Sequence, residues 1–300
     1  MLPSLLLALA AAQPAPATLP RMTPGQVVDA APAAAWRRVD PEHLLIVDLE
    51  GDRRIVVELN ATFAPEHVAN IQRFARAAYW SGGSVYRVQD NYVAQWGLGE
   101  MERAAPAGVI DNPAPEYVRP VEGLKVKALG SPDAYAAATG FVDGWPVALY
   151  RDGTASLAHC YGTVGVGRDL APSTGSGAEL YAIIGHAPRH LDRNIAIVGR
   201  VIDGIEHLSA LTRGTGPSGF YAADQQPAKI SRAVLASMLR EEPVPTYEVM
   251  REDSDSFARY LGVRANRNDD FYRVPAGGVD LCNVNVPTRK VDPDAAANAS

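Results

Sequence analysis

The stretch from residue 84 to residue 97 constrains the fold of this chain more than any other segment. Apolar and polar residues alternate along it, the alternation breaks at residues 89–91, and it then resumes. A period of two is typical of strands with one buried face, and a polar break between two such runs is typical of a turn. The stretch therefore predicts a hairpin that carries a cation, Arg87, in its first strand and an amide, Gln95, in its second.

Another hairpin and a helix are predicted before this stretch. Residues 44–49 and 54–59 are rich in β-branched residues and are separated by a turn sequence at residues 50–52. Pro65 stands where the first turn of a helix tolerates proline, and we expect that helix to end near Ala78. Its apolar stripe at helical spacing consists of Ala64, Val68, Ile71, Phe74 and Ala75.

The size and charge of the chain limit its function. Its 300 residues, of which 47% are hydrophobic, can form one large or two small domains, and 26 Gly with 23 Pro favour many turns over long helices. The net charge of -6 argues against nucleic-acid binding, because affinity for phosphates depends on clustered Lys and Arg. We therefore expect a globular protein with no nucleic-acid partner.

The N-terminus predicts export. Residues 5–12 form an apolar run that is too short to span a membrane but has the length of a signal-peptide core, and small residues follow it. We interpret residues 1–18 as a signal peptide and expect an exported protein, periplasmic or extracellular, with no membrane span after its removal. A disordered start is the alternative, since no Lys or Arg precedes the apolar run. Residues 19–40 are a Pro/Ala-rich lead-in, expected to be unstructured up to about residue 35.

The chain contains two cysteines, Cys160 and Cys282. They lie far apart in the sequence and in different contexts, so we expect them to remain unpaired even in an exported protein. Two cysteines alone do not make a structural zinc site. His186 and His190 have a metal-like spacing, but Pro188 between them opposes a shared helix face and no third ligand is evident. We expect no metal and no cofactor.

The order of these parts resembles the cyclophilin family of peptidyl-prolyl isomerases. In that family a strand, a helix with the pattern AP…V.NF, a strand Y.G..FHR and a strand GFM.QGG follow one another. The corresponding parts here are residues 55–59, then Ala64-Pro65 with Val68, Asn70 and Phe74, then Tyr79 and Gly82 with Tyr86-Arg87-Val88, and finally Tyr92-Val93-Ala94-Gln95.

The second half of the chain supports the same resemblance. Residues 155–158 resemble the family's strand before the active-site loop, and residues 175–181 resemble its NGSQFF segment. Residues 190–192 and 197–201 resemble WLDG…VFG.V, residues 204–211 a second capping helix, and residues 228–234 the closing strand. Each motif is modest alone, but their number, order and spacing over about residues 44–237 make the resemblance specific.

The resemblance implies an all-β fold, a closed antiparallel eight-stranded cyclophilin-like barrel capped by two helices. We place the isomerase domain at residues 41–238 and an inserted loop region at about 98–153, which we expect to be a surface excursion over the pocket rim. Residues 239–300 form a C-terminal extension. Within it, residues 254–267 predict a short helix and residues 280–284 predict a packed strand.

The resemblance also implies a site for proline. The family's catalytic arginine falls on Arg87 and its glutamine on Gln95, so these are the expected catalytic residues. Taken alone, Arg87 would be interpreted as a surface or ion-paired residue and the tyrosines as core aromatics. The proline ring needs an apolar slot. Val93 and Gln95 share one face of a strand, so Tyr92 has to reach this slot from the turn before that strand. The expected substrate-binding residues are Tyr92, Val93, Ala158, His159, Glu179, Tyr181, His190 and Leu191.

Several positions depart from the family pattern. Glu179 replaces a neutral glutamine. Its carboxylate could pair with Arg87 and draw the guanidinium away from the prolyl nitrogen, or it could face solvent. His190 stands for an aromatic residue and Ile195 for a histidine, which predicts weak binding of cyclosporin-like macrocycles. His159-Cys160 stands for Asn-Ala, which predicts altered contacts to the substrate backbone. The remaining departures are Tyr86 for a histidine and Asn91 and Trp96 for glycines.

These observations predict a monomeric peptidyl-prolyl cis-trans isomerase that acts on X-Pro bonds of exported proteins, with proline-containing polypeptides as clients. Two alternatives stay open at this point. One is a non-catalytic chaperone or scaffold that binds proline-containing segments in a degenerate pocket. The other is an exported structural module that interacts through its C-terminal extension. Acceleration of the isomerisation of an Ala-Pro peptide would distinguish the isomerase from both alternatives.

Overall fold

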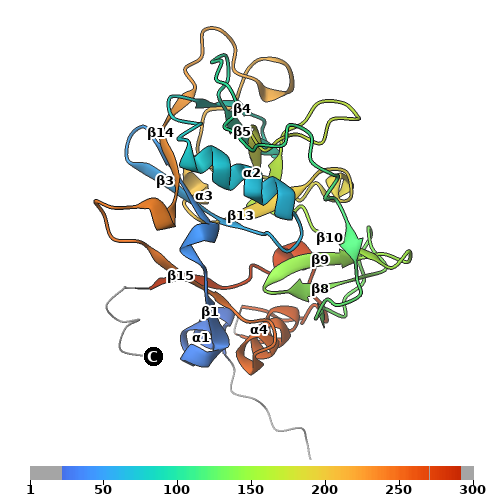
Figure 1. The fold of residues 1–300 in the computed structure, drawn as a ribbon. Coiled ribbons are helices and arrows are strands. Elements are labelled where there is room, and N and C mark those ends of the chain that lie inside the picture. Colours follow the sequence, from blue (N-terminus) through green and yellow to red (C-terminus); the bar gives the residue numbers. More distant parts are fainter. Residues whose placement is uncertain (1–21, 270, 292–300) are drawn as a thin grey trace, which may run out of the picture.

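The computed structural model of the protein describes residues 22–269 and 271–291, and the predicted signal peptide lies outside them. Eight antiparallel strands close into a barrel in the order β11-β12-β5-β4-β14-β2-β3-β13, which confirms the predicted fold class (Figure 1). The barrel strands are β2 (Leu44–Leu49), β3 (Arg53–Leu59), β4 (Ser84–Val88), β5 (Val93–Gly97), β11 (Thr163–Val166), β12 (Leu180–Ile183), β13 (Ile197–Asp203) and β14 (Ala228–Leu235).

Two helices pack on the barrel core. The helix α2 (Pro65–Arg76) begins at the predicted proline and ends two residues before Ala78. Val68, Ile71 and Phe74 of its apolar stripe are buried in one cluster with the barrel side chains, because their helical spacing places them on one face. The helix α3 (Ile205–Ser209) is short and buries Leu208 in the same cluster.

The insertion contains more regular structure than the loop region that the sequence predicted. Its strands β6 (Arg119–Pro120), β7 (Lys127–Ala128), β8 (Ala138–Val142) and β9 (Trp145–Leu149) form a five-stranded sheet with β10 (Thr154–Leu157). Asp143 and Gly144, both at positive φ, make the two-residue turn between β8 and β9. Asp-Gly is a strong hairpin signal, so this turn could have been recognised in the sequence.

The lead-in is folded from Pro24 onward, so the expectation that it is unstructured up to about residue 35 is wrong for these residues. Thr23 caps α1 (Pro24–Asp29), and after a 3₁₀ turn, η1 (Ala33–Ala35), the strand β1 (Trp36–Arg38) follows. Val27 and Ala35 are buried in a cluster with Phe257 of α4 (Asp255–Ala265). The lead-in therefore packs against α4 of the C-terminal extension (Figure 1). Its own composition does not indicate this contact.

The C-terminal extension joins this second core. The strand β15 (Thr246–Met250) lies between β1 and β16 (Thr288–Val291), and α4 has the predicted position. The strand predicted at residues 280–284 is wrong, because a 3₁₀ turn, η6 (Leu281–Asn283), stands there. The Asp280 carboxylate accepts a hydrogen bond from the backbone amide of Cys282 at 2.9 Å, and such a local contact favours a turn over a strand.

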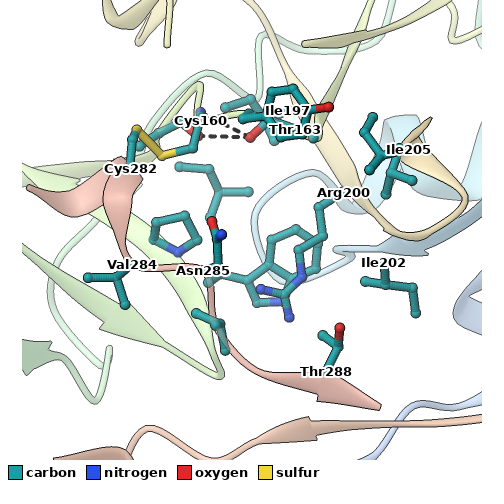
Figure 2. A pocket seen from close by; sticks show the side chains of 18 residues that line it. Cys160, Thr163, Ile197, Arg200, Ile202, Ile205, Cys282, Val284, Asn285 and Thr288 are labelled. Atoms are coloured by element: carbon teal, nitrogen blue, oxygen red, sulfur yellow. Dashed lines mark hydrogen bonds between the residues drawn. A yellow bond between two sulfur atoms is a disulfide. The ribbon is translucent and has the colours of Figure 1, made fainter. Parts of the chain in front are cut away.

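The two cysteines form a disulfide, which corrects the expectation that they remain unpaired. Cys160 and Cys282 are 122 residues apart in sequence, yet their Cα atoms lie 4.9 Å apart. Cys160 lies between β10 and the barrel strand β11, and Cys282 belongs to η6. The bond therefore joins the segment between β10 and β11 to the C-terminal extension (Figure 2). Sequence separation carries no information on this distance, because the packing of the extension sets it.

A cavity of about 230 Å³ lies beside this disulfide (Figure 2). At its wall the Arg200 guanidinium donates to the Glu58 carboxylate at 2.7 Å and to the Gly144 carbonyl at 2.6 Å. The same guanidinium lies over the Trp145 ring, 4.4 Å from its centroid. These contacts tie β3 and β13 of the barrel to the β8–β9 turn.

The remaining 3₁₀ turns are η2 (Pro41–His43), η3 (Arg189–Leu191), η4 (Pro217–Gly219) and η5 (Ala236–Met238). None of the helices between residues 22 and 291, residue 270 aside, has the length and apolar character needed to cross a membrane.

Candidate active site

A cavity of about 540 Å³ lies against β4, β5 and β12, on their faces that point away from the main core. Charged and amide groups occupy one part of its wall and apolar side chains another. None of its lining residues belongs to the insertion, so the expected excursion over the pocket rim is not seen. The lining residues are Arg87, Tyr92, Val93, Gln95, Val166, Gly167, Arg168, Asp169, Leu170, Tyr181, Leu191, Ile195 and Phe220.

Strand register places three of these side chains in a row. Arg87 of β4 pairs with Gln95 of β5, and Gln95 pairs with Tyr181 of β12. Residues directly opposite each other in a sheet point to the same face and contact one another. The neighbouring residues on the other face, such as Val88 and Ala94, are buried in the main core. The alternation in the sequence thus determines both the core and the site.

A β-bulge adds a fourth side chain to this face. The register of β4 against β5 shifts between Val85 and Arg87, so Tyr86 is the extra residue. A bulge re-aims the side chains next to it. As a result both Tyr86 and Arg87, which strict alternation would place on opposite faces, reach the Gln95 amide.

Three acceptors hold the Arg87 guanidinium at the cavity. Its Nε donates to the Ser218 carbonyl at 2.8 Å, its Nη1 to Gln95 Oε1 at 3.0 Å, and its Nη2 to Gln89 Oε1 at 2.7 Å. A guanidinium has five N–H donors, so two remain without an acceptor among the described residues. Burial lowers the pKa of Arg87 from its ordinary value, but an arginine remains charged at any working pH.

An apolar wall faces this cation. Val93, Tyr181 and Ile183 form a small buried cluster against which Tyr92 and Ile195 pack, and Leu191 lines the cavity nearby. Tyr92 reaches the cavity from the turn before β5, and its ring centroid lies 5.9 Å from the Arg87 guanidinium carbon. The wall is an apolar surface beside a fixed positive charge.

Tyr181 is held from behind by a buried histidine. The His159 ring is fully buried, stacks on the Tyr181 ring and contacts its hydroxyl through Nε2 at 3.0 Å. The other ring nitrogen contacts the Asp192 carboxylate at 2.9 Å, and Arg189 donates to that carboxylate in turn. Burial raises the pKa of Tyr181 far above its ordinary value, so its hydroxyl stays neutral. His159 therefore supports the wall and does not itself line the cavity.

The other predicted substrate-binding residues lie outside the cavity lining. Ala158 lines the cavity beside the disulfide, and His190 is exposed. The Glu179 carboxylate accepts a hydrogen bond from the Tyr86 hydroxyl and makes no ion pair with Arg87. Trp96 is buried in the main core and does not fill the cavity.

Sequence reasoning missed Phe220 and the loop 168–170. The Phe220 ring stacks on Tyr86 at 6.0 Å between centroids and lies 5.3 Å from the Arg87 guanidinium carbon. It follows η4 in a segment with no periodic pattern, so no signal in the sequence marks it. Arg168 is fixed by carbonyls of Asp169 and Asn194. Within the described ranges no group of three or more His, Cys, Asp and Glu side chains could hold a metal ion.

Replacing Gly165 by alanine is expected to disturb this wall. Gly165 pairs with Tyr181 across β11 and β12, and a Cβ there would overlap the Tyr181 ring and hydroxyl. The buried ring has His159 behind it, so we expect a loss of about 1–3 kcal/mol in unfolding free energy. Denaturant unfolding measures it.

Gly262→Ala is the matched control for Gly165→Ala. Gly262 lies exposed in α4 with open space at its Cβ position, so this change is expected to add about 0.5–1 kcal/mol through helix propensity. Equal unfolding midpoints for the two variants would contradict the packing of Tyr181 on Gly165.

Comparison with known proteins agrees with this geometry. Residues 45–234 match the family model of the cyclophilin type peptidyl-prolyl cis-trans isomerases. A probable peptidyl-prolyl cis-trans isomerase of Brucella suis is 23% identical over 199 residues, covering 65% of this chain and 84% of the relative, and the Brucella abortus protein of that name matches equally.

A solved structure extends the likeness beyond the barrel. The crystal structure of the cyclophilin AquaCyp293 from Hirschia baltica is 26% identical, with a TM-score of 0.68, and the match covers 85% of this chain and 93% of that one. The share of this chain that is covered exceeds the segment 45–234, so the match includes residues outside the barrel. The family match over most of the chain, together with the closed barrel and the cation beside an apolar wall, shows that this protein belongs to the cyclophilin-type peptidyl-prolyl cis-trans isomerases.

Proposed function

We propose that this isomerase rotates X-Pro bonds of exported proteins, and that Arg87 donates a hydrogen bond to the prolyl nitrogen in the twisted state. The observation that carries the proposal is the position of the Arg87 guanidinium. It is fixed by three acceptors, two of its donors remain available among the described residues, and it lies at the edge of a cavity with an apolar wall.

The chemistry requires no bond to break. The rotational barrier of about 18–20 kcal/mol exists because the nitrogen lone pair conjugates with the carbonyl. In the twisted state that lone pair is localised on nitrogen and becomes a better acceptor. A fixed cation beside it is therefore bound more strongly by the transition state than by either planar isomer, and this difference lowers the barrier.

The apolar wall would hold the proline ring while the preceding carbonyl rotates. Val93, Tyr181 and Leu191 offer hydrocarbon and aromatic surface, and the hydroxyl of Tyr181 is engaged by His159 behind the wall. A ring anchored on one side of the bond confines the rotation to the other side. Gln95 would keep the guanidinium in place, because its Oε1 accepts from Arg87.

Export is supported by the disulfide as well as by the N-terminal sequence. Disulfides form and persist in the periplasm and outside the cell, and are rare where glutathione keeps thiols reduced. The bond between Cys160 and Cys282 is therefore expected of a protein that folds after export. Clients would be exported polypeptides with X-Pro bonds that are slow to isomerise.

Two experiments test the proposal. Purified protein in catalytic amounts should accelerate cis-trans isomerisation of an Ala-Pro peptide. Binding of the peptide without acceleration would favour a chaperone instead. For export, the full-length gene is expressed in a bacterium and the protein is recovered from the periplasmic fraction and medium. Loss of about 18 N-terminal residues in its intact mass is expected, and a full-length cytoplasmic protein would reject export.

A further inference from the structure

A line of three hydrogen bonds leads from Arg87 to a half-buried carboxylate. Gln95 Oε1 accepts from Arg87 at 3.0 Å, and Gln95 Nε2 donates to the Tyr86 hydroxyl oxygen at 2.9 Å. The Tyr86 hydroxyl donates to Glu179. Tyr86 reaches this line because it is the bulge residue of β4.

The two ends of the line together fix the direction of its bonds, because the Arg87 guanidinium has donors only. An ionised carboxylate only accepts, so the hydroxyl of Tyr86 has to donate to Glu179. The oxygen of that hydroxyl is then left to accept, and the Gln95 NH₂ group faces it. The amide oxygen of Gln95 consequently points to Arg87, where an acceptor is required.

We propose that Glu179 is a positioning residue of the isomerase, which acts through Tyr86 to keep the oxygen of the Gln95 amide toward Arg87. This inference rests on the proposed role of Arg87 in the reaction. Glu179 does not line the cavity, so its effect on the rate would be indirect. A reversed amide would turn NH₂ toward the guanidinium, and two donors facing each other would release Arg87 from its position.

The surroundings of Glu179 make the line sensitive to protons. Its carboxylate lies against Gly97, where a Cβ would overlap it, and it also accepts from the Leu98 amide. It borders a hollow of about 500 Å³ that Tyr79, Glu102 and Arg103 also line. Arg103 donates to the carbonyls of residues 78, 79 and 81, and no ion pair with Glu179 is present among the described residues.

Protonation of Glu179 would weaken the line. Burial raises the pKa of the Glu179 carboxyl above its ordinary value, and the hydrogen bond from Tyr86 only partly opposes this. A protonated Glu179 can donate to the Tyr86 oxygen and leave the Tyr86 hydroxyl to donate toward Gln95, where it competes with Arg87 for the amide oxygen. The active form is the ionised one, so kcat is expected to fall as the pH drops through the raised pKa.

Four variants test the proposal by kcat and KM for an Ala-Pro peptide from about pH 5 to 8. Tyr86→Phe keeps the ring on Phe220 but removes the middle link, and Glu179→Leu removes the end. Each is expected to lower kcat at pH 8 about tenfold with little change in KM. Glu179→Gln cannot ionise, and its NH₂ can donate to the Tyr86 oxygen as a protonated carboxyl does, so it should show the low kcat of the wild type at acid pH with a flat pH profile. Tyr79→Phe removes a nearby hydroxyl outside the line and should behave as wild type.

The outcomes separate this inference from the function on which it rests. If Arg87→Ala loses the rate but Tyr86→Phe and Glu179→Leu keep it, the line is structural only and the inference fails alone. If Glu179→Gln titrates as wild type does, Glu179 is not the titrating group and the inference also fails. If Arg87→Ala keeps the full rate, the proposed function fails first. Should Glu179→Leu not fold, Tyr86→Phe and Glu179→Gln decide the question.

Discussion

Arg87→Ala is expected to lower kcat/KM for an Ala-Pro peptide about 100- to 1,000-fold, the loss that follows when one fixed donor to a developing charge is removed. Alanine leaves the prolyl nitrogen without a donor while the apolar wall stays intact. Binding of the proline ring should therefore change little, and the loss should fall on kcat. The measurement is the isomerisation rate at several peptide concentrations, with the uncatalysed rate subtracted.

Arg87→Lys is the matched comparison for the alanine variant. Lysine keeps the charge but offers one flexible ammonium group where Arg87 uses a planar fork to reach Ser218, Gln95 and Gln89 together. Its rate should lie between wild type and Arg87→Ala. Circular dichroism shows whether both variants fold. Folded Arg87→Ala with a wild-type rate would reject the arginine mechanism.

Removing the disulfide is expected to lower the free energy of unfolding by about 2–5 kcal/mol in the double variant Cys160→Ser, Cys282→Ser. The bond closes a long loop, whose ends are 122 positions apart in sequence, and restricts the unfolded chain accordingly. It also pins η6 to the turn that follows β10, where serine hydroxyls would replace buried sulfur. Guanidinium denaturation with and without a reductant measures the effect.

The reductant supplies the control for the disulfide prediction. Wild type should lose stability when reduced, whereas the double serine variant has no disulfide to lose and should not respond. Equal midpoints for oxidised wild type and the double variant would mean that the bond adds nothing to stability. The rate of the double variant with the Ala-Pro peptide then shows whether the support of Tyr181 by His159, the residue before Cys160, depends on the disulfide.

Much of the barrel could be predicted from local patterns. β-Branched residues at 44–49 and 54–59 indicated β2 and β3, alternating residues at 84–97 indicated β4 and β5, and Pro65 with its apolar stripe indicated α2. Arg87, Gln95, Tyr92 and Val93 were predicted because they belong to these strands and their turn, and the structure places all four around one cavity. Signals of this kind extend over a few residues, and local backbone geometry is enough to produce them.

The lead-in and the tail show where local patterns fail. Residues 24–35 look unable to form a core, and they fold because α4 covers Val27 and Ala35. Residues 280–284 look like a strand, and they turn because Asp280 caps η6. The lead-in depends on a partner that lies far away in sequence, whereas at residues 280–284 a local cap outweighs the apolar pattern.

The sequence alone determined that β2, β3, β4 and β5 form, which face of the β4–β5 hairpin is buried, and that a cation, an amide and an aromatic ring belong to that hairpin, because a period of two places side chains without reference to the rest of the chain. Only the tertiary structure decided that Tyr86 turns to the same face as Arg87, that Glu179 ends a hydrogen-bonded line behind the site, that Phe220 covers the guanidinium, and that Cys160 meets Cys282. The bulge in β4, the loop that carries Phe220 and the disulfide depend on barrel closure and on the packing of the extension. These bring together residues that no local spacing connects.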